Sequence, residues 1–299
     1  MMKKRITLIA ALALAALSGA AATPLWLRSA KISPDGKEIA FSYKGDIWKV
    51  PTAGGTAQRL TTHTGYESNP VWSPDGKQIV CSSDRHGNFD VFVMSANGGA
   101  ATRLTTNSAK EQPMAFSPDG AWVYFQAGIQ DPAQSALFPS GALREVYKVP
   151  ATGGRTQQVL ATPAEDICFT ADGSKMLYHD CKGVEDALRK HHTSSITRDV
   201  WIYDAATGKH ANLTNRGGED RNPVLAADGK TVYFLSERNG GPFNVYRFSL
   251  DAPSQVSAVT NHATHPVRSL SMAANGMLCY TYDGEIWVKP SGAEPRKVA

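Results

Sequence analysis

Ser33-Pro34-Asp35-Gly36 is a four-residue turn sequence that returns as Ser73-Pro74-Asp75-Gly76 and as Ser117-Pro118-Asp119-Gly120. Pro presets the backbone of the second residue and Gly accepts a positive φ, so each copy predicts a tight turn between two strands. Weaker copies are Thr170-Ala171-Asp172-Gly173, Ala226-Ala227-Asp228-Gly229 and Ala273-Ala274-Asn275-Gly276. The third residues of successive copies lie 40, 44, 53, 56 and 47 positions apart, which indicates a repeat architecture.

Two further elements follow each turn. The first is an acid or amide, an aliphatic residue and an aromatic residue, as in Asp46-Ile47-Trp48, Asp90-Val91-Phe92, Glu145-Val146-Tyr147, Asp199-Val200-Trp201, Asn244-Val245-Tyr246 and Glu285-Ile286-Trp287. The second closes the unit, as in Arg59-Leu60-Thr61-Thr62, Arg103-Leu104-Thr105-Thr106 and Asn212-Leu213-Thr214. The acid that opens the first element recurs five times, which indicates architecture rather than catalysis.

Each unit is expected to form four short strands, which in the second unit span 69–73, 78–82, 89–94 and 101–105. The third strand is nearly continuous in apolar residues from Val91 to Met94, so both of its faces should be covered. No helical pattern is present to cover them, whereas sheets stacked face to face around an axis would do so. The sequence therefore predicts an all-β, six-bladed β-propeller of four-stranded antiparallel blades. A β-sandwich is the alternative, but it does not require sixfold repetition.

The predicted blades span about 24–62, 66–106, 110–162, 164–215, 219–262 and 265–299, within a propeller domain of residues 23–299. Every blade is then built from contiguous chain, with no strand exchange to close the ring. The first and last blades are expected to meet only through side-chain packing.

Residues 1–22 have the order of a secretory signal peptide. Three charges (Lys3, Lys4 and Arg5) precede a run of 12 residues, Ile6 to Leu17, that is apolar except for Thr7, and the segment ends Ala20-Ala21-Ala22. The run is short for a membrane span, although an uncleaved anchor is the alternative. Removing these residues would lower the net charge from +4 to +1, which gives no reason to expect nucleic acid as a partner. We expect an exported protein, periplasmic or secreted.

Four cysteines would be free to pair after export. Their spacings match no zinc pattern, and Cys168 and Cys181 would lie about 17 Å out of register along their strands. A disulfide tolerates only about 7 Å between Cα atoms, so four free, mostly buried thiols are expected. A Cys168–Cys181 bridge remains the alternative, because Cys181 begins a loop.

Two long connections, at about 127–144 and 180–198, join second to third strands and should emerge on one face of the ring. Loops of this length are usually functional or mobile. Their basic residues are candidates for binding a peptide carboxylate: Arg144, Arg189, Lys190, His191, His192 and Arg198. The alternative is a solvated loop held by ion pairs.

Four acids precede the turns by five or six residues, where the first strands would line an axial tunnel: Glu67, Glu111, Glu165 and Asp220. They are candidates for a tunnel rim that attracts cations or basic peptide segments. The alternative is that they cap backbone N–H groups or pair with neighbours such as Arg221.

No motif for catalysis or cofactor binding is present: the sequence lacks G-x-S-x-G, H-E-x-x-H, a P-loop and G-x-G-x-x-G. We therefore predict no catalytic residue, cofactor or metal. A lactonase-like enzyme with a tunnel metal is an alternative, with the acids supplying some of the oxygen ligands.

The repeat resembles the TolB-type, WD40-like propeller repeat. The stretch Lys190-His191-His192-Thr193-Ser194-Ser195-Ile196-Thr197-Arg198-Asp199-Val200-Trp201 and the position of the propeller resemble the amino-terminal six-bladed propeller of exported tricorn-type serine proteases. The resemblance covers the mature chain and implies a non-catalytic propeller that guides or gates peptides for a catalytic domain absent from this chain. Its partners would be peptides, unfolded segments and downstream protease domains, with a homo-oligomer possible. A stand-alone periplasmic TolB-like binding scaffold is the alternative.

Overall fold

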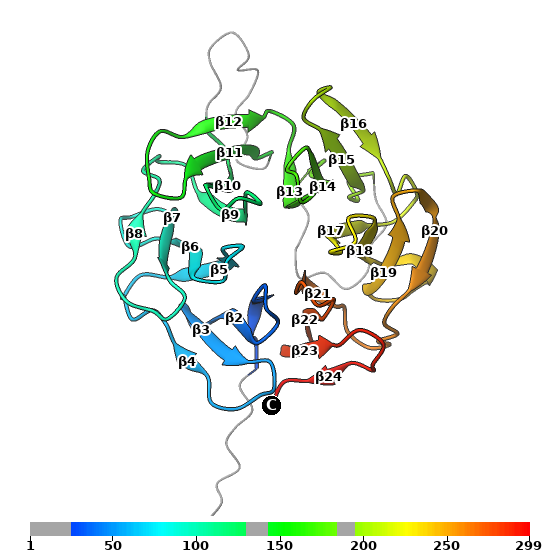
Figure 1. Cartoon of the computed structure of the whole chain (residues 1–299), viewed down its shortest axis with the longest axis horizontal. Coiled ribbons are helices and arrows are strands. Elements are labelled where there is room, and N and C mark those ends of the chain that lie inside the picture. The colour runs from blue at the N-terminus through cyan, green and yellow to red at the C-terminus, as the bar shows by residue number, and fades with distance from the viewer. Residues whose placement is uncertain (1–24, 130–142, 184–194) are drawn as a thin grey trace, which may run out of the picture.

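Six four-stranded antiparallel sheets surround a central axis in the computed structural model, which describes residues 25–129, 143–183 and 195–299 (Figure 1). The strands of every sheet follow one another in chain order, so each sheet is one contiguous blade. The predicted six-bladed β-propeller without strand exchange is therefore confirmed. Within the described ranges the helical structure is a single 3-10 turn, η1 (Arg238–Gly240).

The first three blades lie between residues 28 and 160. Blade one contains β1 (Arg28–Ile32), β2 (Glu38–Tyr43), β3 (Asp46–Pro51) and β4 (Gln58–Arg59). Blade two contains β5 (Glu67–Trp72), β6 (Gln78–Ser83), β7 (Asp90–Ser95) and β8 (Thr102–Arg103). Blade three contains β9 (Glu111–Phe116), β10 (Trp122–Ala127), β11 (Glu145–Pro150) and β12 (Gln157–Leu160).

The other three blades lie between residues 164 and 297. Blade four contains β13 (Ala164–Phe169), β14 (Lys175–Asp180), β15 (Val200–Asp204) and β16 (Lys209–Asn212). Blade five contains β17 (Asp220–Leu225), β18 (Thr231–Ser236), β19 (Asn244–Ser249) and β20 (Ala252–Ala258). Blade six contains β21 (Arg268–Met272), β22 (Leu278–Tyr282), β23 (Glu285–Lys289) and β24 (Arg296–Lys297).

The Ser-Pro-Asp-Gly turn is held by its own side chains. In blade two the Ser73 hydroxyl donates to Asp75 Oδ1 at 2.6 Å and accepts from the Gln78 N–H at 2.9 Å, while the Lys77 N–H donates to Asp75 Oδ1. Gly76 adopts φ +70°, a conformation that a side chain would oppose. These hydrogen bonds, with the Ser73 hydroxyl first, lower the pKa of Asp75.

The closing Leu-Thr element ties the outer strand to the third strand. In blade two the Leu104 N–H donates to the Val91 carbonyl, and the Val91 N–H donates to the Thr105 hydroxyl at 2.9 Å. The carboxylate of the opening acid Asp90 forms an ion pair with the Arg103 guanidinium on the outer strand, at 2.8 Å. The same threonine contact recurs at Thr61, Thr214 and Thr260, so this element is structural.

Apolar side chains fill the joints between blades. Between blades two and three, for example, Val91 and Val93 pack in one cluster with Val123 and Phe125. Blades six and one are joined in the same way, with Ile39 and Phe41 packed against Cys279 and Val288. Each sheet is thus covered on both faces, which explains the continuous apolar third strand.

The closing joint also contains backbone hydrogen bonds, so the expectation of side-chain packing alone is wrong. The Leu27 N–H donates to the Gly284 carbonyl at 3.0 Å, in the position that the Glu67 N–H and the Gly45 carbonyl occupy between blades one and two. A second bond of this joint runs from the Gly55 N–H to the Ala299 carbonyl at 2.7 Å. The ring is therefore closed by the same kind of backbone contact that joins blades one and two.

All four cysteines are free, as predicted. Cys81, Cys181 and Cys279 are buried, and Cys168 is partly exposed. Burial raises the pKa of the Cys81 thiol to about 12.

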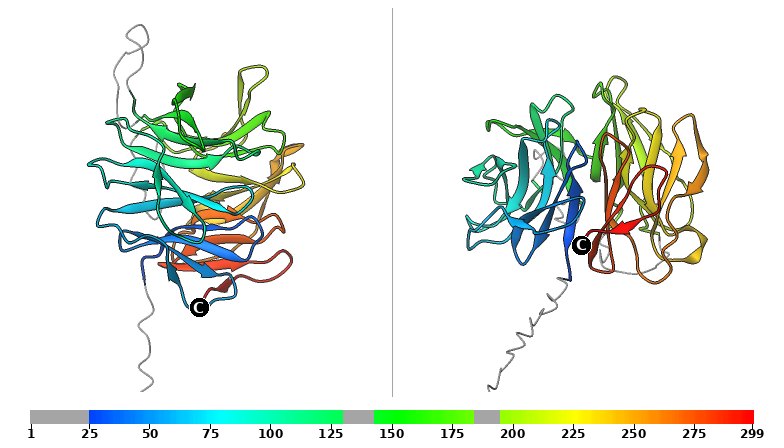
Figure 2. Two further views of the ribbon diagram at one scale, coloured as in Figure 1. Left: turned by 60° about the vertical axis from the view of Figure 1, so that its left-hand side comes forward. Right: turned by 60° about the horizontal axis from the view of Figure 1, so that its bottom comes forward.

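The strands run between two faces of the ring (Figure 2). First and third strands begin on one face, which we call the loop face, and the Ser-Pro-Asp-Gly turns lie on the opposite turn face. The long connections from β10 to β11 and from β14 to β15 both begin and end on the loop face, as expected. Their central residues, 130–142 and 184–194, lie outside the described residues.

Candidate functional site: the central cavity

A bulge interrupts the first strand of every blade. In five blades the bulge contains a residue other than glycine with a positive φ: Ser29, Asn69, Asp166, Asn222 and Ser269. Blade three has Pro113 at this position, whose ring fixes a negative φ. A bulge re-aims the side chains beside it, and here all six of these residues line one cavity on the axis.

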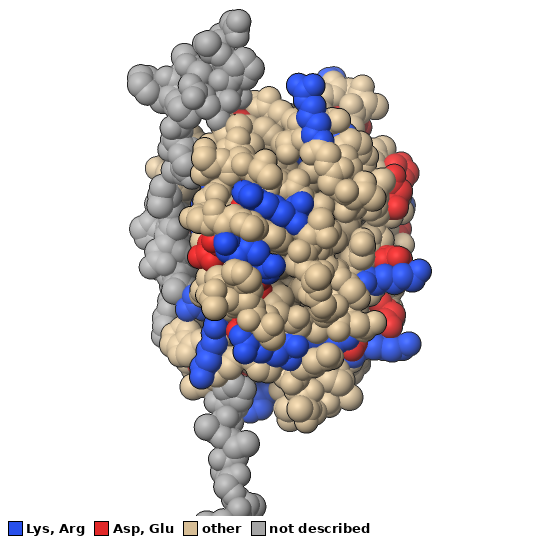
Figure 3. Space-filling view, turned by 90° about the vertical axis from the view of Figure 1, so that its left-hand side faces the viewer, with Lys and Arg blue, Asp and Glu red and all other residues tan. Residues whose placement is uncertain are grey.

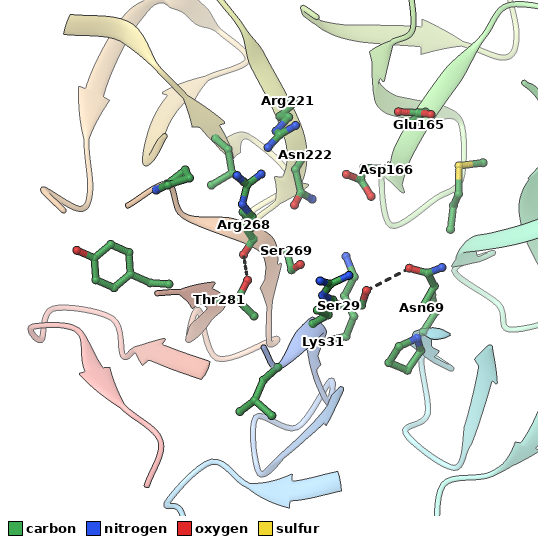
Figure 4. A pocket seen from close by; sticks show the side chains of 18 of the residues that line it. Ser29, Lys31, Asn69, Glu165, Asp166, Arg221, Asn222, Arg268, Ser269 and Thr281 are labelled. Atoms are coloured by element: carbon green, nitrogen blue, oxygen red, sulfur yellow. Dashed lines mark hydrogen bonds between the residues drawn. The ribbon is translucent and has the colours of Figure 1, made fainter. Parts of the chain in front are cut away.

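The bulge residues also connect neighbouring blades. Asn222 of blade five accepts a 2.7 Å hydrogen bond from the Leu270 N–H of blade six and donates to the Leu270 carbonyl at 3.2 Å. The Ser29 hydroxyl of blade one donates to Asn69 Oδ1 of blade two (Figure 4). The polar wall of the cavity is thus partly satisfied by contacts across the joints.

The cavity has a volume of about 750 Å³ and reaches the loop face beside β1 and β21. Residues near the loop face include Trp26, His265 and Tyr282, whereas Lys31, Val71 and Met114 lie further along the strands. Figure 4 shows Lys31, Arg221 and Arg268 around the cavity, on β1, β17 and β21 of three consecutive blades.

Glu165 is held in the wall by two cationic or polar neighbours. His179 Nε2 lies 3.2 Å from Glu165 Oε2, and the Arg198 guanidinium lies 3.5 Å from the same oxygen. The Asn222 N–H donates to His179 Nδ1 at 3.2 Å, and this contact orients the ring with Nε2 toward Glu165. Burial raises the pKa of Glu165, but the His179 hydrogen bond and the Arg198 charge outweigh it and bring the pKa to about 2.

Three of the four acids predicted for the tunnel rim are buried. Glu67 and Asp220 are fully buried and Glu111 is 1% exposed, and none of the three lines the cavity. The reason is the bulge: these acids stand at the first position of the strand, before it, whereas Glu165 stands at the second. Glu165 alone of the four lines the cavity.

Two of the buried acids have matching partners. Glu67 accepts from the Ser83 hydroxyl and pairs with Arg85, and Asp220 likewise contacts Ser236 and Arg238. Asp220 pairs with Arg216 as well, whereas Arg221, its neighbour in sequence, pairs with Glu219.

Glu111 retains the acid without these partners. Ala127 stands where blades two and five have the serine, and Ile129 stands where they have the arginine. Neither carboxyl oxygen of Glu111 has a hydrogen-bond partner within the described parts of the chain. Burial and the nearby Asp90 carboxylate raise the pKa of Glu111 to about 7, although the neighbouring Thr105 hydroxyl opposes them.

The predicted basic residues are divided by the structure. Arg198 lines the cavity, is 9% exposed, and contacts Glu165 and Glu219. Arg144 is partly buried near Lys110, and its charge lowers the pKa of Lys110 in addition to the effect of burial. The other four candidates lie outside the described residues: Arg189, Lys190, His191 and His192.

Four basic residues of the cavity wall were not predicted there from the sequence: Arg28, Lys31, Arg221 and Arg268. Three of them occupy one place, the second residue of the extended stretch that starts each blade, directly before the bulge residue. An alignment of the six repeats on this position would have shown Arg in blades one, five and six.

Among residues 25–129, 143–183 and 195–299, no group of three or more His, Cys, Asp or Glu is arranged to hold a metal ion. No helix in those ranges is long and apolar enough to cross a membrane.

These features define a six-bladed propeller of TolB-type repeats with an axial cavity lined by apolar and hydrogen-bonding side chains. The family model of the tricorn protease N-terminal beta propeller domain matches residues 24–294, and the chain belongs to that family.

The chain matches only parts of longer relatives. It is 35% identical over 72 residues to tricorn protease homolog 1 of Streptomyces coelicolor, which covers 24% of this chain and 7% of that protein. It is 36% identical over 157 residues to the uncharacterised Agrobacterium fabrum protein Atu1656, covering 50% of this chain and 47% of that protein. The chain thus spans less than half the length of these curated relatives.

Solved structures agree on the fold. A crystal structure of the tricorn protease superimposes with a TM-score of 0.76 at 20% identity, covering 93% of this chain and 26% of that chain. TolB from Acinetobacter baumannii gives a TM-score of 0.60 at 20% identity, covering 82% of this chain and 56% of that chain.

Proposed function

We propose that this chain is the non-catalytic propeller of an exported tricorn-like serine protease, and that it guides or gates peptides to or from a catalytic domain on the same polypeptide. The observation that carries the proposal is the family match over residues 24–294 of a chain that covers only 26% of the tricorn protease it resembles. The order of basic, apolar and small residues within residues 1–22 supports export.

The cavity fits a role in handling peptides. It has about 750 Å³ of space and an opening on the face that carries both long connections. Its wall mixes apolar side chains with hydrogen-bonding groups, which would contact the side chains and the backbone of an extended segment.

Photo-crosslinking tests the proposal. Met114 lines the cavity, whereas Ser95 is exposed at the end of β7 on the turn face. A photoreactive phenylalanine at Met114 should crosslink to unstructured peptides, and the same residue at Ser95 should not. Equal crosslinking at both positions, or none at Met114, would refute the peptide role.

A stand-alone TolB-like scaffold is the second candidate, favoured by the TM-score of 0.60 with TolB. The two candidates differ in what the gene encodes after Ala299. A downstream reading frame with a Ser and His catalytic domain supports the protease, and a stop codon at that point supports the scaffold.

A further inference from the structure

The large hydrophobic side chains that are exposed within the described residues all lie on the loop face. They are Leu25 (51% exposed), Trp26 (68%), Tyr66 (46%) and Leu143 (42%), each just before a first or third strand. Isolated exposed hydrophobic residues are ordinary, but their restriction to one face distinguishes it from the turn face. Two of the four, Leu25 and Trp26, also line the cavity.

Trp26 is held with its indole in solvent at the cavity opening. Its φ is +68°, a conformation that is costly for a bulky residue. The hydrogen bond from the Leu27 N–H to the Gly284 carbonyl fixes the chain beside Trp26. The two segments lie so close that a Cβ on Gly284 would be 3.1 Å from the Trp26 backbone nitrogen. Tyr282 lines the same part of the cavity, and we call Leu25, Trp26 and Tyr282 the Trp26 shelf.

The cavity wall is richer in cations than in anions. Five Lys or Arg residues line it (Arg28, Lys31, Arg198, Arg221 and Arg268), against three acids (Glu165, Asp166 and Asp283). Glu165 already pairs with Arg198, and Asp283 lies 3.3 Å from the His265 ring. On the side of the outer wall that Figure 3 shows, by contrast, basic and acidic side chains are interspersed.

Lys31 is the cation best placed to bind a ligand. It is partly buried, and its ammonium lies 3.5 Å from the Leu270 carbonyl. No carboxylate of the described residues lies within 4.0 Å of Lys31 or of Arg28, which stands between it and the shelf in sequence. The cation of Arg28 instead lies 5.8 Å from the Trp26 ring centroid.

We propose that the cavity binds an extended peptide segment that places a hydrophobic side chain on the Trp26 shelf and an Asp or Glu side chain at Lys31. This proposal rests on the proposed function and specifies its peptide class. Five residues of extended chain from Trp26 to Lys31 would rise about 16 Å, and the bulge between Arg28 and Lys31 shortens this distance. A ligand with three residues between its hydrophobic and acidic side chains therefore matches the site.

Calorimetry with capped peptides tests this class. The probe peptides carry Leu and, after three glycines, either Asp or Lys, and both are acetylated and amidated so that no terminal charge remains. We expect the Asp peptide to bind the purified chain at least about tenfold more tightly, since a partly desolvated opposite charge favours one ligand and a like charge disfavours the other. Lys31→Glu should reverse this preference, and Lys31→Met should abolish it.

Lys77→Glu is the matched control. This substitution makes the same change of charge as Lys31→Glu, but on the turn face, where the Lys77 side chain is 81% exposed. It should leave the preference for the Asp peptide intact, and thermal melting of all variants confirms that they fold. Trp26→Ala should weaken the binding of both peptides.

The outcomes separate this proposal from the peptide role itself. If both peptides bind wild type equally, or if Lys31→Glu keeps the preference for Asp, the acidic class is wrong while the peptide role stands. If neither peptide binds and Met114 captures none by crosslinking, the proposed function fails and this proposal fails with it.

Discussion

Glu111→Gln should stabilise the propeller at alkaline pH, although it removes a charge from a buried polar position. Glu111 is 1% exposed at the joint between blades two and three, and Ala127 and Ile129 replace the serine and arginine that neutralise its counterparts. Its pKa is raised by burial and the Asp90 charge and lowered by the Thr105 hydroxyl and the Arg103 charge, and the raising effects dominate.

The magnitude follows from the raised pKa. The pKa of Glu111 rises from 4.5 to about 7, which corresponds to about 3 kcal/mol at 1.36 kcal/mol for each pKa unit. The folded state holds its proton more tightly than the unfolded state, so unfolding becomes easier as pH rises from about 4.5 through 7. Below 4.5 both states are protonated and the group has no effect.

Urea denaturation of wild type and Glu111→Gln at pH 4.5 and pH 8 measures this effect. The stability of the variant relative to wild type should increase by about 3 kcal/mol between the two pH values. Adding Ala127→Ser and Ile129→Arg to wild type should remove the same pH dependence, because it supplies the partners that Glu67 has.

Glu67→Gln is the control with the opposite expected sign. It leaves the partly buried Arg85 without its carboxylate, so it should lose stability at both pH values, by up to about 3 kcal/mol. If Glu111→Gln is as destabilising at pH 8 as Glu67→Gln, then Glu111 is stabilised by its surroundings and the reasoning is refuted.

Three further predictions concern the closing joint, the turns and the thiols. Gly54→Ala should lower the unfolding free energy by at least about 1 kcal/mol more than Gly153→Ala. Both glycines have a positive φ, but only a Cβ at Gly54 would meet the Ala299 carbonyl oxygen, at 2.5 Å. Similar urea midpoints for the two variants would contradict this prediction. Hydrogen bonds, of which the one from the Thr170 hydroxyl has the largest effect, bring the pKa of Asp172 to about 2. The contribution of the Asp172 carboxylate to stability is therefore lost as pH falls from 3.8 through 2. Thr170→Val should raise the pKa of Asp172, and NMR titration of its carboxyl group would measure the shift. Burial raises the pKa of Cys81, Cys168 and Cys279 to about 12. These three thiols of the native protein should therefore not react with an aromatic disulfide reagent at pH 8. Absorbance of the thiolate that the reagent releases would show any reaction.

The repeated elements were predictable because their hydrogen bonds are local. Ser73, Asp75 and Gly76 complete a turn within six residues, and Thr105 caps the strand that begins 15 residues earlier. Such contacts leave similar residues at matching positions of the blades, so the blade count and the strand order follow from the sequence.

The cavity wall was not predictable from strand alternation, because the bulge resets which side chains face the axis. Glu67 and Glu165 differ by one position relative to the bulge, and this step separates a buried acid from one in the cavity. Five bulge residues other than glycine have a positive φ, and residue type alone does not predict this conformation. Asn69, Asp166 and Asn222 belong to the residue types that tolerate a positive φ best.

The charges of the cavity are arranged unequally around the axis, which a symmetric repeat alone would not produce. Arg221, Arg268 and Arg28 stand on blades five, six and one, whereas Glu165 and Asp166 stand together on blade four. Because the blades share one backbone frame, this asymmetry comes from side chains beside the bulge and not from a change of fold. An acidic ligand would therefore be attracted to one side of the cavity, the side that carries the Trp26 shelf, and would bind there in a defined orientation.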